Sequence, residues 1–156
     1  YFITICVQNK ESFFGDIRYS KMILNDFGRI INFYWNELPD HFKNIELGEY
    51  QIMPNHIHGI IIIDKSGDCR GEVTSPLQDS KRPPSLGQII AYFKYQSTKQ
   101  INQLRKPPGI KLWQRNYYEH IIRDDDLNRI QSYIKHNPLN WKDDKYLLKS
   151  CCSLDI

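Results

Sequence analysis

Cysteine is scarce in this chain of 156 residues, and its copies are irregularly placed. They form no CxxC pair, and two of them are adjacent: Cys6, Cys69, Cys151 and Cys152. This pattern argues against a disulfide framework and favours reduced thiols in a cytoplasm. A structural zinc site shared by cysteines and histidines is an alternative, but no cysteine has a spacing that supports it.

Long apolar runs are also lacking. The longest, Ile60–Ile63, is far too short to cross a bilayer, and no apolar stretch ending in small residues indicates a signal peptide. We therefore expect no membrane partner. Because the chain does not begin with methionine, we also expect that a native leader precedes Tyr1.

The composition excludes wholesale disorder. Hydrophobic residues make up 40% of the chain and charged residues 25%, which are the values of a globular protein. The length suits one unit that buries a core without disulfides, so we expect a single domain over residues 1–156.

Net charge is small at +3, but its distribution is uneven. Between Lys81 and Arg123 nine basic residues face one acid, Glu119, which leaves that stretch at +8. Several aromatic residues lie in the same stretch, which suits single-stranded nucleic acid, since rings stack on bases while cations hold phosphates. The alternative is that solvated lysines on helix faces happen to cluster.

Hydrophobic periodicity predicts the order strand, helix, strand, strand, loop, helix, strand, helix. We expect strands over 1–8, 45–53, 56–64 and, with an interruption, 110–123, and helices over 20–38, 85–101 and 127–137. The polar, aperiodic segment 65–84 is expected to be a long mobile loop. This order predicts an α+β fold of the ferredoxin-like kind, an antiparallel sheet with helices packed on one face.

The strongest local motif is His56-Ile57-His58, which precedes the isoleucine run. Alternate residues of a strand face the same side, so the two imidazoles project together from a rigid strand. Such a pair is a natural half of a metal site. The competing interpretation is that the two histidines are satisfied polar residues at a strand end, and the pattern alone does not decide between the two.

A second pair lies near the end of the last helix. Tyr133 and Asn137 are four residues apart and therefore share one helix face. A phenol can attack phosphorus when a metal polarises its target, and an amide oxygen suits a hard divalent ion. Without the histidines, a boundary tyrosine and an asparagine helix cap would be the better interpretation.

The basic stretch supplies candidates for nucleic-acid contact. Arg115 and Arg123 could bind phosphates, and Trp113 or Tyr117 could stack on a base, although a core strand would use the same residues. The full candidate set is Lys94, Lys99, Lys111, Trp113, Arg115, Tyr117 and Arg123.

Together these motifs resemble the single-tyrosine HUH transposases, in particular the REP-associated tyrosine transposase family. The resemblance covers nearly the whole chain in the family's order. It rests on Met53–Gly59 (MPNHIHG), on Leu112–Arg115 (LWQR) with Tyr118–His120 (YEH), and on Tyr133-Ile134 with Asn137-Pro138. Further matches are Ser85–Gly87 at the start of the middle helix and the first strand.

The resemblance implies an HUH endonuclease core in which His56 and His58 hold Mg²⁺ or Mn²⁺, with Asn137 as the third ligand and Tyr133 as the nucleophile. It implies cleavage and rejoining of single-stranded DNA at hairpin-flanked ends through a 5′-phosphotyrosine. It further implies a nucleoid-associated protein in the cytoplasm of a bacterial or archaeal cell. Relatives include dimers and monomers, so a homodimer stays open.

Two other functions remain in competition at this point. One is the same core used as a replication-initiator-type nickase, but no helicase or partner domain accompanies it in this chain. The other is a non-enzymatic single-stranded nucleic-acid-binding module, which would bind without metal and would not cleave.

Overall fold

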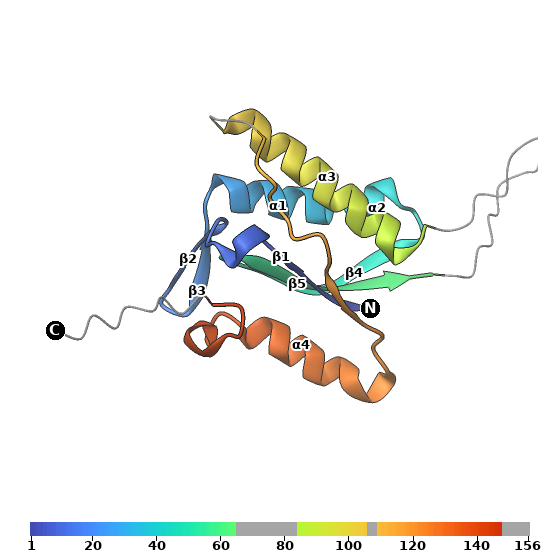
Figure 1. Ribbon diagram of the computed structural model, residues 1–156. Coiled ribbons are helices and arrows are strands. Elements are labelled where there is room, and N and C mark those ends of the chain that lie inside the picture. Colours follow the sequence, from blue (N-terminus) through green and yellow to red (C-terminus); the bar gives the residue numbers. More distant parts are fainter. Residues whose placement is uncertain (65–83, 106–108, 148–156) are drawn as a thin grey trace, which may run out of the picture.

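A four-stranded antiparallel sheet forms the centre of the computed structural model, which describes residues 1–64, 84–105 and 109–147 (Figure 1). Its strands are β1 (Phe2–Cys6), β4 (Ile45–Met53), β5 (His56–Ile63) and β6 (Tyr118–His120), and their spatial order is β4-β5-β1-β6. The loop expected over 65–84 lies outside the described residues except for Pro84. No helix of the described ranges is long and apolar enough to span a membrane.

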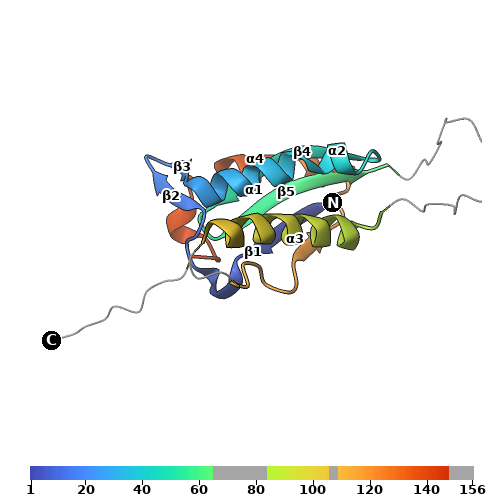
Figure 2. The same ribbon diagram turned by 90° about the horizontal axis from the view of Figure 1, so that it is seen from above.

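Two long helices follow the first and third of these strands in the chain. They are α1 (Asp26–Asn36) and α3 (Leu86–Leu104), and they give the order β1-α1-β4-β5-α3-β6. This is the ferredoxin-like arrangement, so the predicted α+β fold is confirmed. One detail differs: α1 and α3 cover one face of the sheet, whereas α4 (Leu127–His136) lies against the other (Figures 1 and 2).

Because side chains alternate along a strand, the two faces of the sheet carry different residues. The main core includes Ile5 and Ile57, which are paired across β1 and β5 and pack with α1 and α3. The adjacent pair, Thr4 opposite His58, faces the side of α4. On that side the apolar cluster is small, with Ile60, Ile130 and Ile134 as its buried members.

Close approach of α1 to β5 depends on Gly59. A Cβ atom at this position would lie 2.3 Å from Cζ2 of Trp35, whose ring is fully buried. Real Cβ atoms do not approach so closely, so the absence of a side chain lets the indole lie directly on the strand.

The predicted helix over 20–38 is wrong in its first part. Residues there form a hairpin of β2 (Gly15–Arg18) and β3 (Lys21–Leu24), and α1 begins only at Asp26. The two-residue turn is made by Tyr19 and Ser20, both at positive φ (50° and 59°). Such turns normally carry Asn-Gly or Asp-Gly, so this pair gives no hairpin signal.

The end of that predicted helix also differs. α1 ends at Asn36, and Leu38 with Pro39 begins a further short helix, α2 (Leu38–His41). Proline fits there because the first-turn N–H groups of a helix need no partner within it.

The interrupted strand predicted over 110–123 is mostly irregular. Only β6 pairs with β1, and the preceding part makes a single bridge between Val7 and Trp113. Trp113 is nevertheless 4% exposed, and its indole N–H donates to Ser97 Oγ over 3.0 Å. Leu112 and Trp113 therefore fill the core without a continuous ladder, whereas Ile121 is 67% exposed.

Candidate metal and nucleophile site

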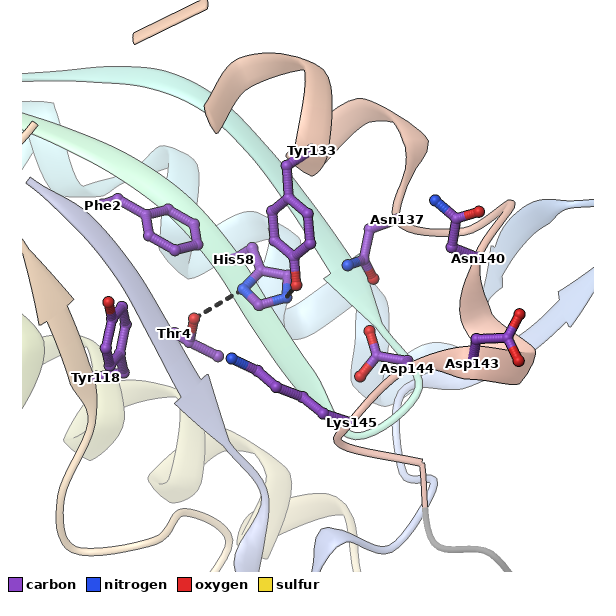
Figure 3. A pocket seen from close by; sticks show the side chains of 10 residues that line it. All are labelled: Phe2, Thr4, His58, Tyr118, Tyr133, Asn137, Asn140, Asp143, Asp144 and Lys145. Atoms are coloured by element: carbon purple, nitrogen blue, oxygen red, sulfur yellow. Dashed lines mark hydrogen bonds between the residues drawn. The ribbon is translucent and has the colours of Figure 1, made fainter. Parts of the chain in front are cut away.

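Three of the four predicted metal and nucleophile residues line one pocket of about 380 Å³ (Figure 3), and the fourth, His56, lies against His58 at its edge. His58 reaches it from β5, and Tyr133 and Asn137 reach it from the end of α4. The segment after α4 closes the opposite side. The remaining lining residues are Phe2, Thr4, Tyr118, Asn140, Asp143, Asp144 and Lys145.

The two histidines meet as their spacing predicts. His56 and His58 are 0% and 1% exposed, and their Nε2 atoms lie 3.0 Å apart. Because both side chains project from the α4 face of the same strand, their ring nitrogens converge rather than diverge.

Asn55 fixes the proton position on His56. Its Nδ2 donates to the backbone carbonyls of Lys10 (2.9 Å) and Tyr146 (2.8 Å), so its Oδ1 must be the acceptor for His56 Nδ1 at 2.7 Å. With the proton on Nδ1, His56 keeps a lone pair on Nε2. This is the tautomer that a metal ligand needs.

Thr4 supports His58 in a more adaptable way. Its Oγ1 lies 2.8 Å from His58 Nδ1. Since His56 Nε2 carries a lone pair, the 3.0 Å contact between the rings requires a proton on His58 Nε2, and Thr4 then donates to Nδ1. A hydroxyl both donates and accepts, so His58 can change tautomer and present its Nε2 lone pair to a cation.

Both imidazoles are neutral at physiological pH. Burial, with the charge of Lys145 as a second cause, lowers the pKa of His58 to about 3. Burial also lowers the pKa of His56 well below its usual value, with smaller contributions from His58, Lys145 and Lys10. Neutral imidazoles are the form that binds metals.

Tyr133 points its phenol at the histidine pair from 75 residues away in the chain. Its oxygen lies 3.4 Å from His58 Nε2. Burial, followed by the charge of Asp144, raises its pKa above the ordinary value near 10, while Lys145 and a hydrogen bond from Asn137 oppose that shift. The phenol is therefore protonated at neutral pH, and a nearby positive charge would favour its ionisation.

The side-chain oxygen of Asn137 is buried in this pocket. The residue is 2% exposed, and its Oδ1 has no hydrogen-bond partner among the described residues. A buried amide oxygen without a donor is costly in a folded protein. A hard divalent cation would satisfy it, so the donor set of this pocket fits a metal ion.

Sequence reasoning missed the segment that follows α4. Asp144, His56 and His58 have ligand atoms within 4.8 Å of one another, and the three could hold a metal ion. Lys145 lies over the Tyr146 ring, with Nζ 4.9 Å from its centroid. The adjacent acids Asp143 and Asp144 are visible in the sequence, but no spacing rule connects Asp144 to a histidine 86 residues earlier.

Most candidates for nucleic-acid contact lie at a second pocket of about 440 Å³. Its lining includes Lys94, Lys99, Lys111, Trp113 and Arg115. Trp113 is largely core, as described above. Lys99, Lys111 and Arg115 are exposed and give this groove a positive rim.

The other three candidates differ in their surroundings. The Lys94 ammonium donates to the carbonyls of Gln114 (2.9 Å), Arg115 (3.2 Å) and Asn116 (3.3 Å), so it also holds the segment that forms the groove. Tyr117 is half-buried, with Lys94 Nζ 5.4 Å from its ring centroid. Arg123 is exposed and does not line the groove.

Comparisons with known proteins agree with this architecture. No protein-family model matches the chain. An uncharacterized protein of Haemophilus influenzae is 40% identical over 154 residues, which cover 93% of this chain and 83% of that protein. A second protein of the same organism, named "Putative REP-associated tyrosine transposase", is 27% identical over 150 residues, covering 89% of this chain and 69% of that protein.

Among solved structures, a REP-associated tyrosine transposase bound to a REP hairpin matches with a TM-score of 0.60 and 18% identity. The match covers 90% of this chain and 66% of that one, so this chain spans about two thirds of the solved transposase. The two share a fold. The fold implied by the resemblance is thereby confirmed, and the name of the 27% identical relative agrees with the family that the motifs resemble.

Proposed function

We propose that this chain is a metal-dependent transposase. It belongs to one family with the Haemophilus influenzae relative that is 40% identical to it, and it shares the fold of a REP-associated tyrosine transposase. It would cleave and rejoin single-stranded DNA at hairpin-flanked ends. One observation carries this proposal: the phenol of Tyr133 lies 3.4 Å from Nε2 of His58, whose ring is buried against that of His56.

Tyr133 is the proposed nucleophile. Its oxygen attacks the phosphorus in line with the 3′-oxygen of the preceding nucleotide, the phenolic proton passes to solvent, and the 3′-oxygen leaves and takes up a proton. The products are a 5′-phosphotyrosine and a free 3′-hydroxyl. Because the phosphodiester bond is exchanged rather than hydrolysed, a second 3′-hydroxyl can reverse the step and join strands without ATP.

The proposed metal ligands on this chain are His56, His58 and Asn137. When bound, Mg²⁺ or Mn²⁺ would supply a positive charge beside the scissile phosphate and the phenol. The protein itself positions the ligands, through Asn55 on His56 and Thr4 on His58. It also fixes the phenol by burying the end of α4 against Ile60.

The DNA path that we propose follows the segment from Lys111 to Tyr118, because this segment lines both pockets. Exposed Lys99 and Arg115 would bind phosphates, and Tyr95, which is 64% exposed at the same groove, offers a ring for stacking. Trp113 and Lys94 would support the groove from within, and Tyr117 and Arg123 would add contacts at its margin. With DNA as the partner, we also propose that the protein acts at the nucleoid, in the cytoplasm.

The test uses a single-stranded oligonucleotide with a hairpin from DNA flanking the gene, incubated with the full chain and Mn²⁺. We expect a band of reduced mobility on a denaturing gel, lost in Tyr133→Phe, while hairpin binding in a native gel persists. Tyr19→Phe is the matched control, because Tyr19 is 98% exposed on the β2–β3 turn. Equal adduct yields from Tyr133→Phe and Tyr19→Phe would refute the proposed nucleophile.

A further inference from the structure

We propose that the carboxylate of Asp144 is a ligand of the same cation and supplies the negative charge that the other ligands lack. The inference rests on the proposed function only in that a divalent ion acts at the histidine pair. It adds a residue that lies in an irregular segment, outside all the motifs of the sequence.

Geometry places this carboxylate at the ion position. Asp144, His56 and His58 each offer a ligand atom, and these atoms lie within 4.8 Å of one another. Ligands about 2.1 Å from a shared ion must lie within roughly twice that distance of one another, so small side-chain adjustments would suffice. Figure 3 shows the Asp144 carboxylate beside Asn137 and Lys145, facing the pocket.

Charge and donor chemistry point the same way. Two neutral imidazoles and an amide bring no net negative charge to a divalent ion, and hard ions such as Mg²⁺ and Mn²⁺ prefer carboxylate oxygen. Within the described ranges Asp144 forms no ion pair with a basic side chain. Its charge is therefore available to a metal.

Asn137 provides an independent observation. Its Oδ1 is buried without a hydrogen-bond partner in the described structure and lies on the side of Asp144 (Figure 3). An amide oxygen and a carboxylate that face one pocket cannot satisfy each other, since both are acceptors. A cation between them satisfies both and completes a set of two nitrogens and two oxygens.

The segment that carries Asp144 is fixed in place. One Asp144 oxygen accepts the backbone N–H of Tyr146 at 2.7 Å, and the carbonyl of Tyr146 accepts from Asn55 Nδ2 at 2.8 Å. Asn55 is the residue that orients His56. The same side chain thus holds one imidazole ligand and the backbone next to the carboxylate ligand.

The experiment measures Mn²⁺ binding to the full chain without DNA, by isothermal titration calorimetry and by the electron paramagnetic resonance signal of free Mn²⁺. We expect Asp144→Asn to weaken binding at least about tenfold, because loss of even an indirect partner of a metal ligand has an effect of this size. Asn keeps an oxygen for the Tyr146 amide, so the segment should stay in place. Asp143→Asn is the matched control, because it removes the same charge from an exposed neighbour that lines the same pocket.

Two failures are distinguishable. If His58→Ala binds Mn²⁺ as tightly as the parent chain, the metal site and with it the proposed function are overturned. If His58→Ala loses binding while Asp144→Asn and Asp143→Asn bind Mn²⁺ equally, only the role of Asp144 is refuted. Thermal unfolding of each apo variant separates loss of ligand from loss of fold, and an Asp144→Asn chain that is folded yet fully competent to bind Mn²⁺ contradicts the inference.

Discussion

Replacing Asn55 by alanine tests how the turn between β4 and β5 organises the site. The side chain is 1% exposed and makes three hydrogen bonds: it accepts from His56 and donates to the carbonyls of Lys10 and Tyr146. The change removes all three at once. It leaves one imidazole N–H and two carbonyls without their partner.

The expected loss of unfolding free energy follows from these three unpaired groups. A buried polar group left unpaired costs about 1–3 kcal/mol, so three of them at the lower end give about 3 kcal/mol of lost unfolding free energy. His56 also loses the contact that fixes its tautomer, which typically weakens metal binding by about 10–100-fold. We therefore expect Asn55→Ala to be less stable and to bind Mn²⁺ more weakly.

Chemical denaturation measures the first effect and titration calorimetry of the folded variant measures the second. Asn128→Ala is the control, because Asn128 is an exposed residue of α4. Should Asn55→Ala match Asn128→Ala both in unfolding free energy, within 1 kcal/mol, and in Mn²⁺ affinity, the tautomer argument fails.

Three other substitutions test separate parts of the structure. Gly59→Ala should cost about 1–3 kcal/mol in unfolding free energy, because the new methyl meets the Trp35 ring, and an unchanged melting temperature would contradict the packing. Thr4→Val should weaken Mn²⁺ binding without unfolding the chain, since His58 Nδ1 loses its partner; equal affinity would exclude that support. Lys94→Met should lower the melting temperature because three carbonyls lose their donor. Burial lowers the pKa of Lys94 to about 8, so between pH 8 and its ordinary value of 10.5 the unfolded parent chain binds one proton more than the folded chain. The unfolding free energy of the parent therefore rises with pH in this window, whereas that of Lys94→Met gains nothing from this group. The difference in stability between the two chains should grow over this window, and a shrinking difference would refute the buried state of Lys94.

The histidine pair and the strand that carries it were predictable because a strand repeats every two residues. His56 and His58 had to share a face wherever the strand lay. Tyr133 and Asn137 followed in the same way from the helical repeat. That the two pairs meet depends on α4 crossing the face opposite α1, which local periodicity does not determine; only the family resemblance implied it.

Other features left no local pattern to interpret. The β2–β3 hairpin was missed because Tyr19 and Ser20 adopt positive φ without the residues that favour it. Asp144 was missed because its position depends on an irregular return of the chain to Asn55. Trp113 is a residue type that favours strands, yet its indole is held by a side-chain hydrogen bond to Ser97 and the segment around it pairs with no neighbouring strand beyond a single bridge.

The placement of α4 on its own face of the sheet has a consequence for engineering. Side chains that could touch DNA phosphorus or metal lie on one side, and the large apolar core lies on the other, with β1 and β5 as the partition. Substitutions that fill or stiffen the layer beneath α1 and α3 can therefore raise heat tolerance without altering the reactive groups. Conversely, removing the buried histidines would leave Asn55 and Thr4 without their partners, so a chain stripped of these groups should lose heat resistance unless both partners are replaced as well.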